Sequence, residues 1–138
     1  ASDVYKRQLY NYVGQPWRTQ EIVDEVLHTL YFNNPDGLSG NEDCGQMSAW
    51  YILNAMGFYQ VCPGKPVYSI GRPLFNEATV HLKDGKSFKV IAHNNSRDNK
   101  YVRSIVLNGN KLETPFFTHQ DIVDGGTLEL TMGSEPLK

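Results

Sequence analysis

The sequence lacks a strong excess of either charge, has few cysteines and contains no long apolar run. Its formal net charge is −2 over 138 residues, so nothing indicates a nucleic acid or an anionic membrane as a partner. No apolar run is long enough to cross a bilayer. The two cysteines, Cys44 and Cys62, fit no zinc-binding spacing and are too few for a disulfide scaffold. Whether they pair depends on how close the fold brings their backbones, so the redox compartment stays open.

Several common catalytic signatures are also missing. The four histidines form no HExxH-type pair, and neither Ser39 nor Ser48 lies in a G-x-S-x-G context. Cys44 directly follows two acidic residues, which disfavour the reactive thiolate form. The chain has no internal repeat and no low-complexity tract. These absences exclude the simplest zinc-protease, serine-hydrolase and repeat-protein interpretations.

The start of the chain differs in character from the remainder of the sequence. Residues 1–8, "ASDVYKRQ", lack helical periodicity and join abruptly to the aromatic run "LYNYVGQPW". The string "DVYKRQ" resembles the in-frame translation of a transposon end used in sequencing libraries. We therefore predict that residues 1–8 are non-native, exclude them from functional reasoning, and expect the natural chain to continue upstream.

Residues 9–60 have the pattern of helices. Pro16 suits the first turn of a helix, and apolar residues then recur at helical spacing, which predicts a helix from about Pro16 to about Tyr31. The stretch "NNPDGLSG" predicts a loop. A second helix comes after it that is apolar around most of its circumference and ends at Gly57, so we expect it to be buried on several sides. A short loop between the helices would make an αα-hairpin.

Residues 61–138 have the pattern of strands. The runs "ATVHL" and "SFKVIA" alternate and are separated by Asp84-Gly85, a strong hairpin signal. "NGN" predicts a second turn, Thr118 and Asp121 could cap one short helical turn, and "GGTLELTM" predicts a last strand. The fold class is therefore α+β, with an αα-hairpin followed by an antiparallel β meander or sandwich segment. The helical part alone makes a poor domain, which also indicates truncation.

The stretch "SGNEDCGQMSAWY" places two acidic residues before the second helix. Ser39 and Glu42 have the spacing of a capping box, and Asn41 or Asp43 could serve as the N-cap instead. The same position suits chemistry, because a helix N-terminus keeps a carboxylate ionised, as a general base or metal ligand requires. Asn41, Glu42 and Asp43 offer hard oxygen ligands, which fit calcium better than zinc. Residues alone leave both interpretations open.

Gln15 and Trp17 flank the start of the first helix. They could simply pack there, or they could present an amide and an aromatic platform that line a sugar pocket. The four histidines, among them His28, are more often solvated or satisfied residues than catalytic ones.

The order of several quoted blocks identifies a resemblance. "LYNYVGQPWRTQ", "PDGLSGNEDCGQMSAWYILNAMGFYQVCPG" and "YSIGRPLFNEATVHLKDGKSF", followed by "NNS", "LNG", "TH" and "GGTLEL", are similar to the C-terminal end of glycoside hydrolase family 92. The similarity runs from about Leu9 to about Gly133. It implies exo-acting, calcium-dependent, inverting α-mannosidases in which an N-terminal β-sandwich packs on an (α/α)6 barrel. Residues 9–60 would then be the last barrel helices and residues 61–138 the terminal β segment.

The resemblance also implies roles for individual residues. Asp43 would be the general base, and Glu42 a calcium ligand or second carboxylate. Asn41 replaces an acid found in many relatives, so it could only bind the ion or donate and accept hydrogen bonds. The family's general acid lies upstream, so this chain alone should be inactive. The implied partners are a mannose-containing glycan, with α-1,2-linked mannose as the expected type, and the missing N-terminal part. The implied location is periplasmic, secreted or surface-attached.

Two other functions remain open from the sequence. One is a non-catalytic carbohydrate-binding or β accessory module, in which the acids of the "SGNEDCGQMSAWY" stretch are only helix caps. The other is a different (α/α)6-barrel hydrolase that acts on α-glucosides.

Overall fold

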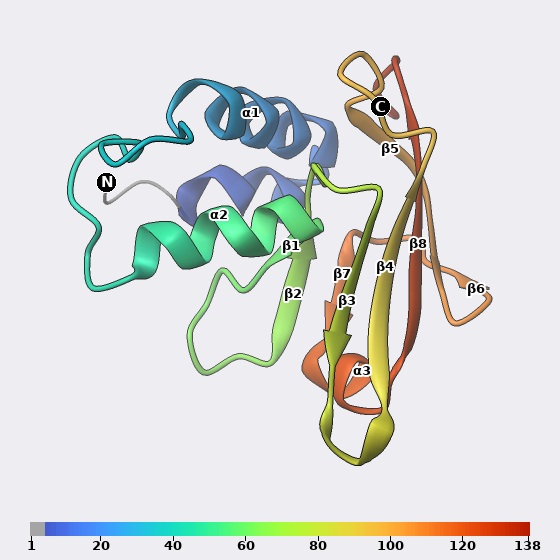
Figure 1. Cartoon of the computed structure of the whole chain (residues 1–138). Helices are drawn as coiled ribbons and strands as arrows, with labels where there is room; N and C mark the ends of the chain where they lie inside the picture. The colour runs from blue at the N-terminus through green and yellow to red at the C-terminus, as the bar shows by residue number, and fades with distance from the viewer. Residues whose placement is uncertain (1–4) are drawn as a thin grey trace.

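The computed structural model describes residues 5–138 and divides into a helical half, residues 5–57, and a β half, residues 58–138 (Figure 1). The helical half contains the 3₁₀ helix η1 (Tyr5–Val13) and the α-helices α1 (Pro16–Thr29) and α2 (Gln46–Met56). The two halves lie side by side. Because helices and strands occupy separate parts of the chain, the α+β class is confirmed. Within residues 5–138, none of the helices has the length and apolar character needed to cross a bilayer.

The predicted ends of the helices are confirmed where a single residue sets them. Pro16 is at the start of α1, which ends at Thr29, close to the predicted end. Gly57 closes α2 with a left-handed φ of 109°, and its N–H donates to the carbonyl oxygens of Leu53 and Asn54. Residues with a side chain rarely adopt that conformation, so the glycine is needed there.

The connection between α1 and α2 differs from the prediction. It is a long segment, residues 30–45, not a short loop, because α2 begins only at Gln46. The helix starts late because the residues before it form a left-handed turn that is incompatible with an α-helix. The two helices run in opposite directions in Figure 1. The prediction that a short loop joins them into a tight αα-hairpin is wrong.

Of the residues predicted to be non-native, 1–4 lie outside the described part of the chain. Residues 5–8 belong to η1, where Gln8 is fully buried and its Nε2 donates to Asn54 Oδ1 over 2.8 Å. The foreign origin of residues 1–8 stays a prediction.

The β half contains two sheets. The three-stranded sheet has the order β1-β2-β7, and the five-stranded sheet has the order β3-β4-β8-β5-β6. The strands are β1 (Phe58–Tyr59), β2 (Val67–Ile70), β3 (Glu77–His81), β4 (Ser87–His93), β5 (Tyr101–Leu107), β6 (Asn110–Lys111), β7 (Phe116–Thr118) and β8 (Gly126–Gly133).

The local signals of the β half are confirmed. β3 and β4 form the predicted hairpin, with the 3₁₀ turn η2 (Lys83–Gly85) between them, and β5 and β6 form the second. The short helix α3 (His119–Val123) begins with a full capping box, in which the Thr118 hydroxyl accepts from the Asp121 N–H and the Asp121 carboxylate accepts from the Thr118 N–H.

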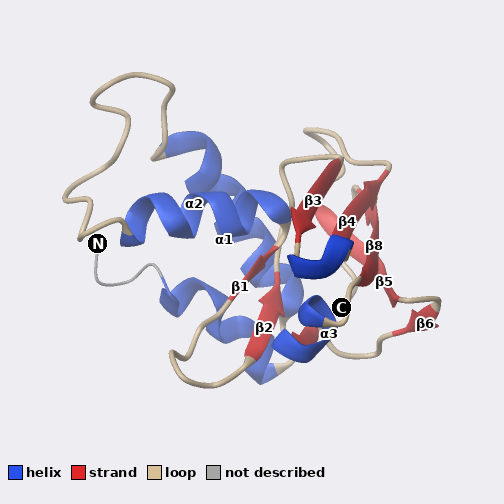
Figure 2. Cartoon of the chain, turned by 60° about the horizontal axis from the view of Figure 1, so that its bottom comes forward, coloured by secondary structure: helices blue, strands red, loops and turns tan. Residues whose placement is uncertain are grey.

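The prediction of an antiparallel meander is wrong for the last strand. β8 pairs with β4 in parallel and with β5 antiparallel, so it lies between them (Figure 2). The strand itself was predicted correctly, and its side chains alternate in burial, with Leu128, Leu130 and Met132 all buried. Alternation specifies the face of each residue but not the neighbouring strand, and chain order suggested β5 and β6 instead.

The two halves meet along a polar stripe on α1. At a register shift in β5, the Val102 N–H donates to Gln20 Oε1 over 3.0 Å, and the Tyr101 hydroxyl donates to Glu21 Oε1 over 2.7 Å. Asp24, one turn further along α1, accepts from Arg72 Nε over 2.8 Å. The polar side of α1 thus faces the β half.

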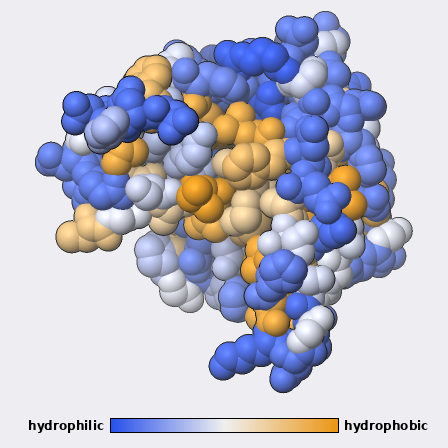
Figure 3. Space-filling view, viewed as in Figure 1, coloured by the Kyte–Doolittle hydropathy of each residue, from blue (hydrophilic) through white to orange (hydrophobic). Residues whose placement is uncertain are grey.

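The expectation that α2 is buried on several sides is only partly met. Met47, Trp50, Asn54 and Ala55 are buried, but Ser48, Ala49 and Ile52 are exposed. Figure 3 shows apolar side chains gathered over α2 and toward the sheets, and Ile52 is 51% exposed. In this chain α2 therefore has one enclosed side and one open apolar side.

Candidate functional site

The two candidate carboxylates lie in a turn directly before α2, which we call the acid turn, residues 41–45. Asp43, Cys44 and Gly45 have consecutive left-handed φ values of 55°, 58° and 92°. Glycine adopts this conformation readily, aspartate tolerates it, and cysteine rarely adopts it. The turn redirects the chain sharply into α2 and presents its side chains at the N-terminal end of the helix.

Glu42 caps α2 from outside the helix. Its Oε1 accepts a hydrogen bond from the Ser48 N–H over 3.0 Å, and its backbone oxygen accepts from the Met47 N–H over 3.1 Å. The Asp43 backbone oxygen accepts from the Gln46 N–H over 3.2 Å. The N-cap itself is Gly45, and no side-chain bond is made at that position. The cap prediction therefore identified the right function for Glu42, but the predicted capping box with Ser39 is wrong.

Asp43 has the opposite environment. Its side chain is exposed, and its carboxylate has no hydrogen-bond or ion-pair partner among residues 5–138. An ionised carboxylate that is not committed to the protein can accept a proton from water or bind a ligand. The two neighbouring acids thus differ: the Glu42 carboxylate is hydrogen-bonded to α2, whereas the Asp43 carboxylate is exposed to solvent.

Aromatic rings pack together beside the first turns of α2. The Tyr31 hydroxyl donates to the Met47 carbonyl oxygen over 3.2 Å, and its ring lies 5.7 Å from that of Trp50 and 4.8 Å from that of Tyr51. Burial is the main reason that the pKa of Tyr31 is raised to about 12, and Glu42 adds to the effect, although Arg7 opposes it. The raised pKa keeps Tyr31 a neutral hydrogen-bond donor beyond the ordinary tyrosine pKa of about 10.

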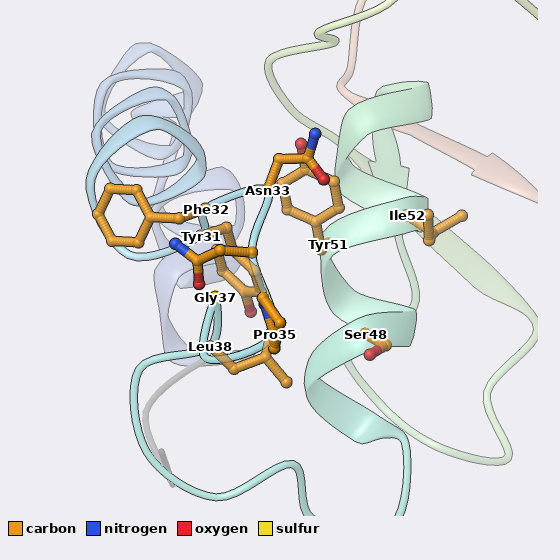
Figure 4. Close-up of a pocket in the computed structure, with 10 residues that line it drawn as sticks. Tyr31, Phe32, Asn33, Pro35, Gly37, Leu38, Ser48, Tyr51 and Ile52 are labelled. Atoms are coloured by element: carbon orange, nitrogen blue, oxygen red, sulfur yellow. The ribbon is translucent and has the colours of Figure 1, made fainter.

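A hollow of about 570 Å³ lies between residues 31–38 and α2 (Figure 4). Three aromatic residues line it together with two amides, a hydroxyl and aliphatic groups: Tyr31, Phe32, Asn33, Asn34, Pro35, Gly37, Leu38, Ser48, Tyr51 and Ile52. No residue of the acid turn lines the hollow, but Ser48, which does, donates its N–H to Glu42 Oε1, so one hydrogen bond links the two. Apolar faces combined with a few polar groups are typical of small-ligand sites.

Gln15 and Trp17 lie at the start of α1, and Figure 1 shows that α1 begins at the end of the helical half opposite the start of α2. Gln15 is the exposed N-cap residue of α1 and makes no side-chain cap. Trp17 is half-buried, with the Arg18 guanidinium 5.2 Å and Lys138 Nζ 5.5 Å from its ring. At 1.5 Å per residue, α1 alone spans roughly 21 Å. The structure therefore does not bring these two residues together with the acid turn.

The oxygen donors of the acid turn fit calcium in type but not in number. Asn41 and Asp43 are exposed, and one oxygen of Glu42 is already used by α2. Calcium takes about six to eight oxygen ligands, and the described residues contain no group of three or more His, Cys, Asp or Glu that could hold a metal ion. These residues could supply part of a calcium site, not a complete one.

Sequence reasoning missed a charged cluster between the two halves. Asp24, 5% exposed, accepts from Arg72 Nε and from Arg97 Nη1, with 3.0 Å between Arg97 Nη1 and Asp24 Oδ2. Arg72 also donates to Asn95 Oδ1 over 2.6 Å and to the Ser96 carbonyl oxygen over 2.8 Å. No short motif announces the cluster, because its members are far apart in sequence. Since Arg72 is fully engaged by the protein, the cluster holds the two halves together.

Comparison with known proteins places this arrangement in a family. The sequence model of the glycosyl hydrolase family 92 catalytic domain matches residues 6–134. The α-mannosidase BT3965 of Bacteroides thetaiotaomicron is 41% identical and superposes with a TM-score of 0.90 over 96% of this chain. The inverting mannosidase BT2199 of the same organism is 46% identical, with a TM-score of 0.91 over 97%.

A fungal relative is more distant. An "uncharacterized secreted glycosidase" of Arthroderma benhamiae is 30% identical over 92% of this chain. The chain spans only 17% of that protein and 18% of each Bacteroides enzyme. The family match nevertheless covers most of the chain, and the solved relatives retain its fold closely. This chain belongs to glycosyl hydrolase family 92.

Proposed function

We propose that this chain is part of a calcium-dependent, inverting exo-α-mannosidase that removes mannose, of the α-1,2-linked type, from glycans. The observation that carries the proposal is the acid turn, which leaves the carboxylate of Asp43 exposed and unpaired beside the capped end of α2. Two solved relatives are named as mannosidases, one of them as inverting, and BT3965 is also known in complex with mannoimidazole.

The chemistry of inversion assigns the role of Asp43. An inverting glycosidase uses one carboxylate as general base to activate water, and a second carboxyl group roughly 6.5–9.5 Å away as general acid. Asp43 is the proposed base, because a base must be ionised and free to approach a water molecule. Glu42, held by α2, is the proposed second carboxylate of the site. The general acid is proposed to come from a part of the longer protein outside this chain, so this chain alone should not release mannose.

Calcium is proposed as the cofactor, with Asn41 and the unbonded oxygen of Glu42 among its ligands. The ion would bind mannose hydroxyls and favour a distorted ring. Because the acid turn provides only a few of the required oxygens, the remaining ligands must come from the substrate, water and the longer protein. A secreted location is proposed from the name of the Arthroderma relative, and periplasmic or surface-attached locations remain the alternatives that the family resemblance implies. Gln15 and Trp17 remain predicted sugar contacts, at a subsite separate from the acid turn.

The test uses the complete natural protein and an α-1,2-linked mannobiose. We expect mannose release to require calcium, to stop with a chelator, and to fall by about 10²–10⁴ in Asp43→Asn. Asp98→Asn, an exposed aspartate in the β half, is the matched control and should keep full activity. Full activity in Asp43→Asn would remove Asp43 from the base role, and activity after complete chelation would remove calcium. Binding of the sugar without any release would favour the carbohydrate-binding module instead.

A further inference from the structure

The left-handed turn that presents Asp43 needs something to hold it. Asp43 and Cys44 both have left-handed φ values, which residues with side chains rarely adopt, and they do so in succession. The Asp43 side chain makes no bond that would fix it. Its direction therefore depends on the backbone of the turn, and that backbone must be stabilised by the residues around it.

Glu42 provides that stabilisation at two points. Its backbone oxygen accepts from the Met47 N–H and its carboxylate Oε1 accepts from the Ser48 N–H. Each bond joins Glu42, the residue before Asp43, to a residue of α2 that comes after Asp43. The two bonds therefore hold the turn closed against the first residues of α2. A carboxylate that accepts from the free N–H groups of a helix also benefits from the helix dipole.

We propose that Glu42 is a positioning residue, which acts on the reaction through Asp43 by fixing the acid turn to the N-terminus of α2. This inference rests on the proposed function, because Asp43 has a reaction to serve only if the protein is a glycosidase. It separates the adjacent acids by mechanism: Asp43 needs its charge, whereas Glu42 needs an acceptor oxygen at the place where its Oε1 lies. The calcium contact proposed for the other Glu42 oxygen is a separate role, so activity is compared at saturating calcium.

Two substitutions distinguish an acceptor from a charge. Glu42→Gln removes the negative charge but keeps a carbonyl oxygen that can accept from the Ser48 N–H. Glu42→Ala removes both. A positioning role therefore predicts that glutamine rescues most of what alanine loses, whereas a general base or an indispensable charged ligand would be lost in both variants.

The first measurement is amide hydrogen exchange at Ser48 in the 138-residue chain, followed by NMR, and it does not depend on activity. We expect exchange at Ser48 to be at least about tenfold faster in Glu42→Ala and within about threefold of the parent in Glu42→Gln. Glu25→Ala, which alters an exposed glutamate on α1, should leave Ser48 unchanged. Unchanged exchange at Ser48 in Glu42→Ala would overturn the proposal.

The second measurement is mannose release by the complete protein at saturating calcium. We expect kcat to fall about tenfold or more in Glu42→Ala with little change in KM, and by less than about fivefold in Glu42→Gln, because misplacing a catalytic group affects the reacting step. Loss of activity in Glu42→Gln as large as in Asp43→Asn overturns the positioning role.

The two measurements also separate this inference from the proposed function. If Ser48 exchange changes in the expected order but Asp43→Asn stays fully active, the proposed base is wrong, and the positioning of a catalytic Asp43 is wrong with it, while the cap itself stands. If Asp43→Asn is inactive and Ser48 exchange is unchanged in Glu42→Ala, the proposed function stands and the positioning role of Glu42 falls.

Discussion

The β half and the helical half bury their apolar residues to different degrees. In the β half, Phe88, Leu128 and Leu130 are completely buried in one continuous core. The helical half has a smaller cluster around Val23 and Trp50. It exposes more large apolar side chains, among them Leu9, Tyr12, Val13, Phe32 and Ile52. Apolar burial is the main stabilising contribution to folding, so most of the stability should come from the β half.

Buried polar groups show the same contrast. Among residues 8–138, the buried side-chain atoms without a hydrogen-bond partner are Gln8 Oε1, Asn11 Oδ1, Thr19 Oγ1 and Trp50 Nε1, all in the helical half. Native proteins pair most such atoms. The helical half thus has both open apolar surface and unmet hydrogen bonds, and its order depends on the polar stripe of α1 that binds it to the β half.

The largest effect should come from the core of the β half. Phe88→Ala removes a fully buried ring stacked 5.8 Å from Phe117, and should lower the free energy of unfolding by about 3–5 kcal/mol. Urea denaturation followed by circular dichroism measures it. If the helical half dominated stability, the loss would be below about 1 kcal/mol.

The next largest effect should come from the cluster that joins the halves. Asp24→Ala leaves Arg72 buried without its carboxylate and should cost about 3 kcal/mol. Both tryptophans, Trp17 and Trp50, lie in the helical half, so their fluorescence reports mainly on that half. We expect the fluorescence transition to occur at lower urea than the circular dichroism transition in this variant.

The control for that experiment is the neighbouring, exposed Glu25. In Glu25→Ala the fluorescence and circular dichroism transitions should coincide and should occur at nearly the same urea concentration as in the parent. The reason is that surface substitutions usually change stability by less than about 0.5 kcal/mol. Coincident transitions in Asp24→Ala would mean that the two halves unfold as one unit, and the contrast between them would then have no energetic meaning.

A smaller effect should come from the bond between Tyr101 and Glu21. The hydrogen bond to Glu21 is the main reason that the pKa of Tyr101 is raised to about 12, and burial adds to it. Above pH 10 the unfolded chain loses this proton while the folded chain keeps it, so stability should fall between about pH 10 and 12. Tyr101→Phe should cost about 1–2 kcal/mol at pH 8.

The measurement compares thermal unfolding of the parent and Tyr101→Phe from pH 8 upward. The difference between them should narrow as the pH passes 10, because the parent loses the contribution that the variant never had. Other tyrosines titrate in both proteins, so only the difference is interpreted. A difference that stays constant up to pH 12 contradicts the raised pKa.

The smallest effect should come from the open face of α2. Ile52→Ser changes a side chain that is 51% exposed, and should alter the stability of the 138-residue chain by no more than about 0.5 kcal/mol. Urea denaturation of Ile52→Ser and of Phe88→Ala under the same conditions compares the two losses of stability directly. A loss above about 1.5 kcal/mol would show that α2 is enclosed in solution.

Signals that act over a few residues predicted their structures correctly. Pro16 begins α1, Gly57 ends α2, Asp84-Gly85 lies in the β3–β4 hairpin, and Thr118 with Asp121 caps α3. In each case the responsible residues are neighbours in the chain, so the sequence contains the whole interaction. The residue pattern of β8 was equally local, and it correctly predicted a strand there.

Structures that depend on distant residues were not predictable in this way. The partners Asp24 and Arg97 are 73 positions apart, and the parallel pairing of β8 with β4 depends on the path of the chain between them. At the candidate site, the cap interpretation of Glu42 was correct in kind, and the role of Asp43 stays a prediction. The left-handed turn and the Ser48 partner were missed, although Gly45 was an available signal for such a turn.

The position of β8 has a consequence for the order in which the β half can be built during synthesis. β8 comes after every other strand in the chain, yet it lies between β4 and β5 in the five-stranded sheet. Until residues 126–133 leave the ribosome, the β3–β4 and β5–β6 hairpins have no shared partner, and their facing edges remain unpaired. An emerging chain therefore carries exposed strand edges until residues 126–133 are translated, the condition in which chaperone binding or misassembly competes with folding.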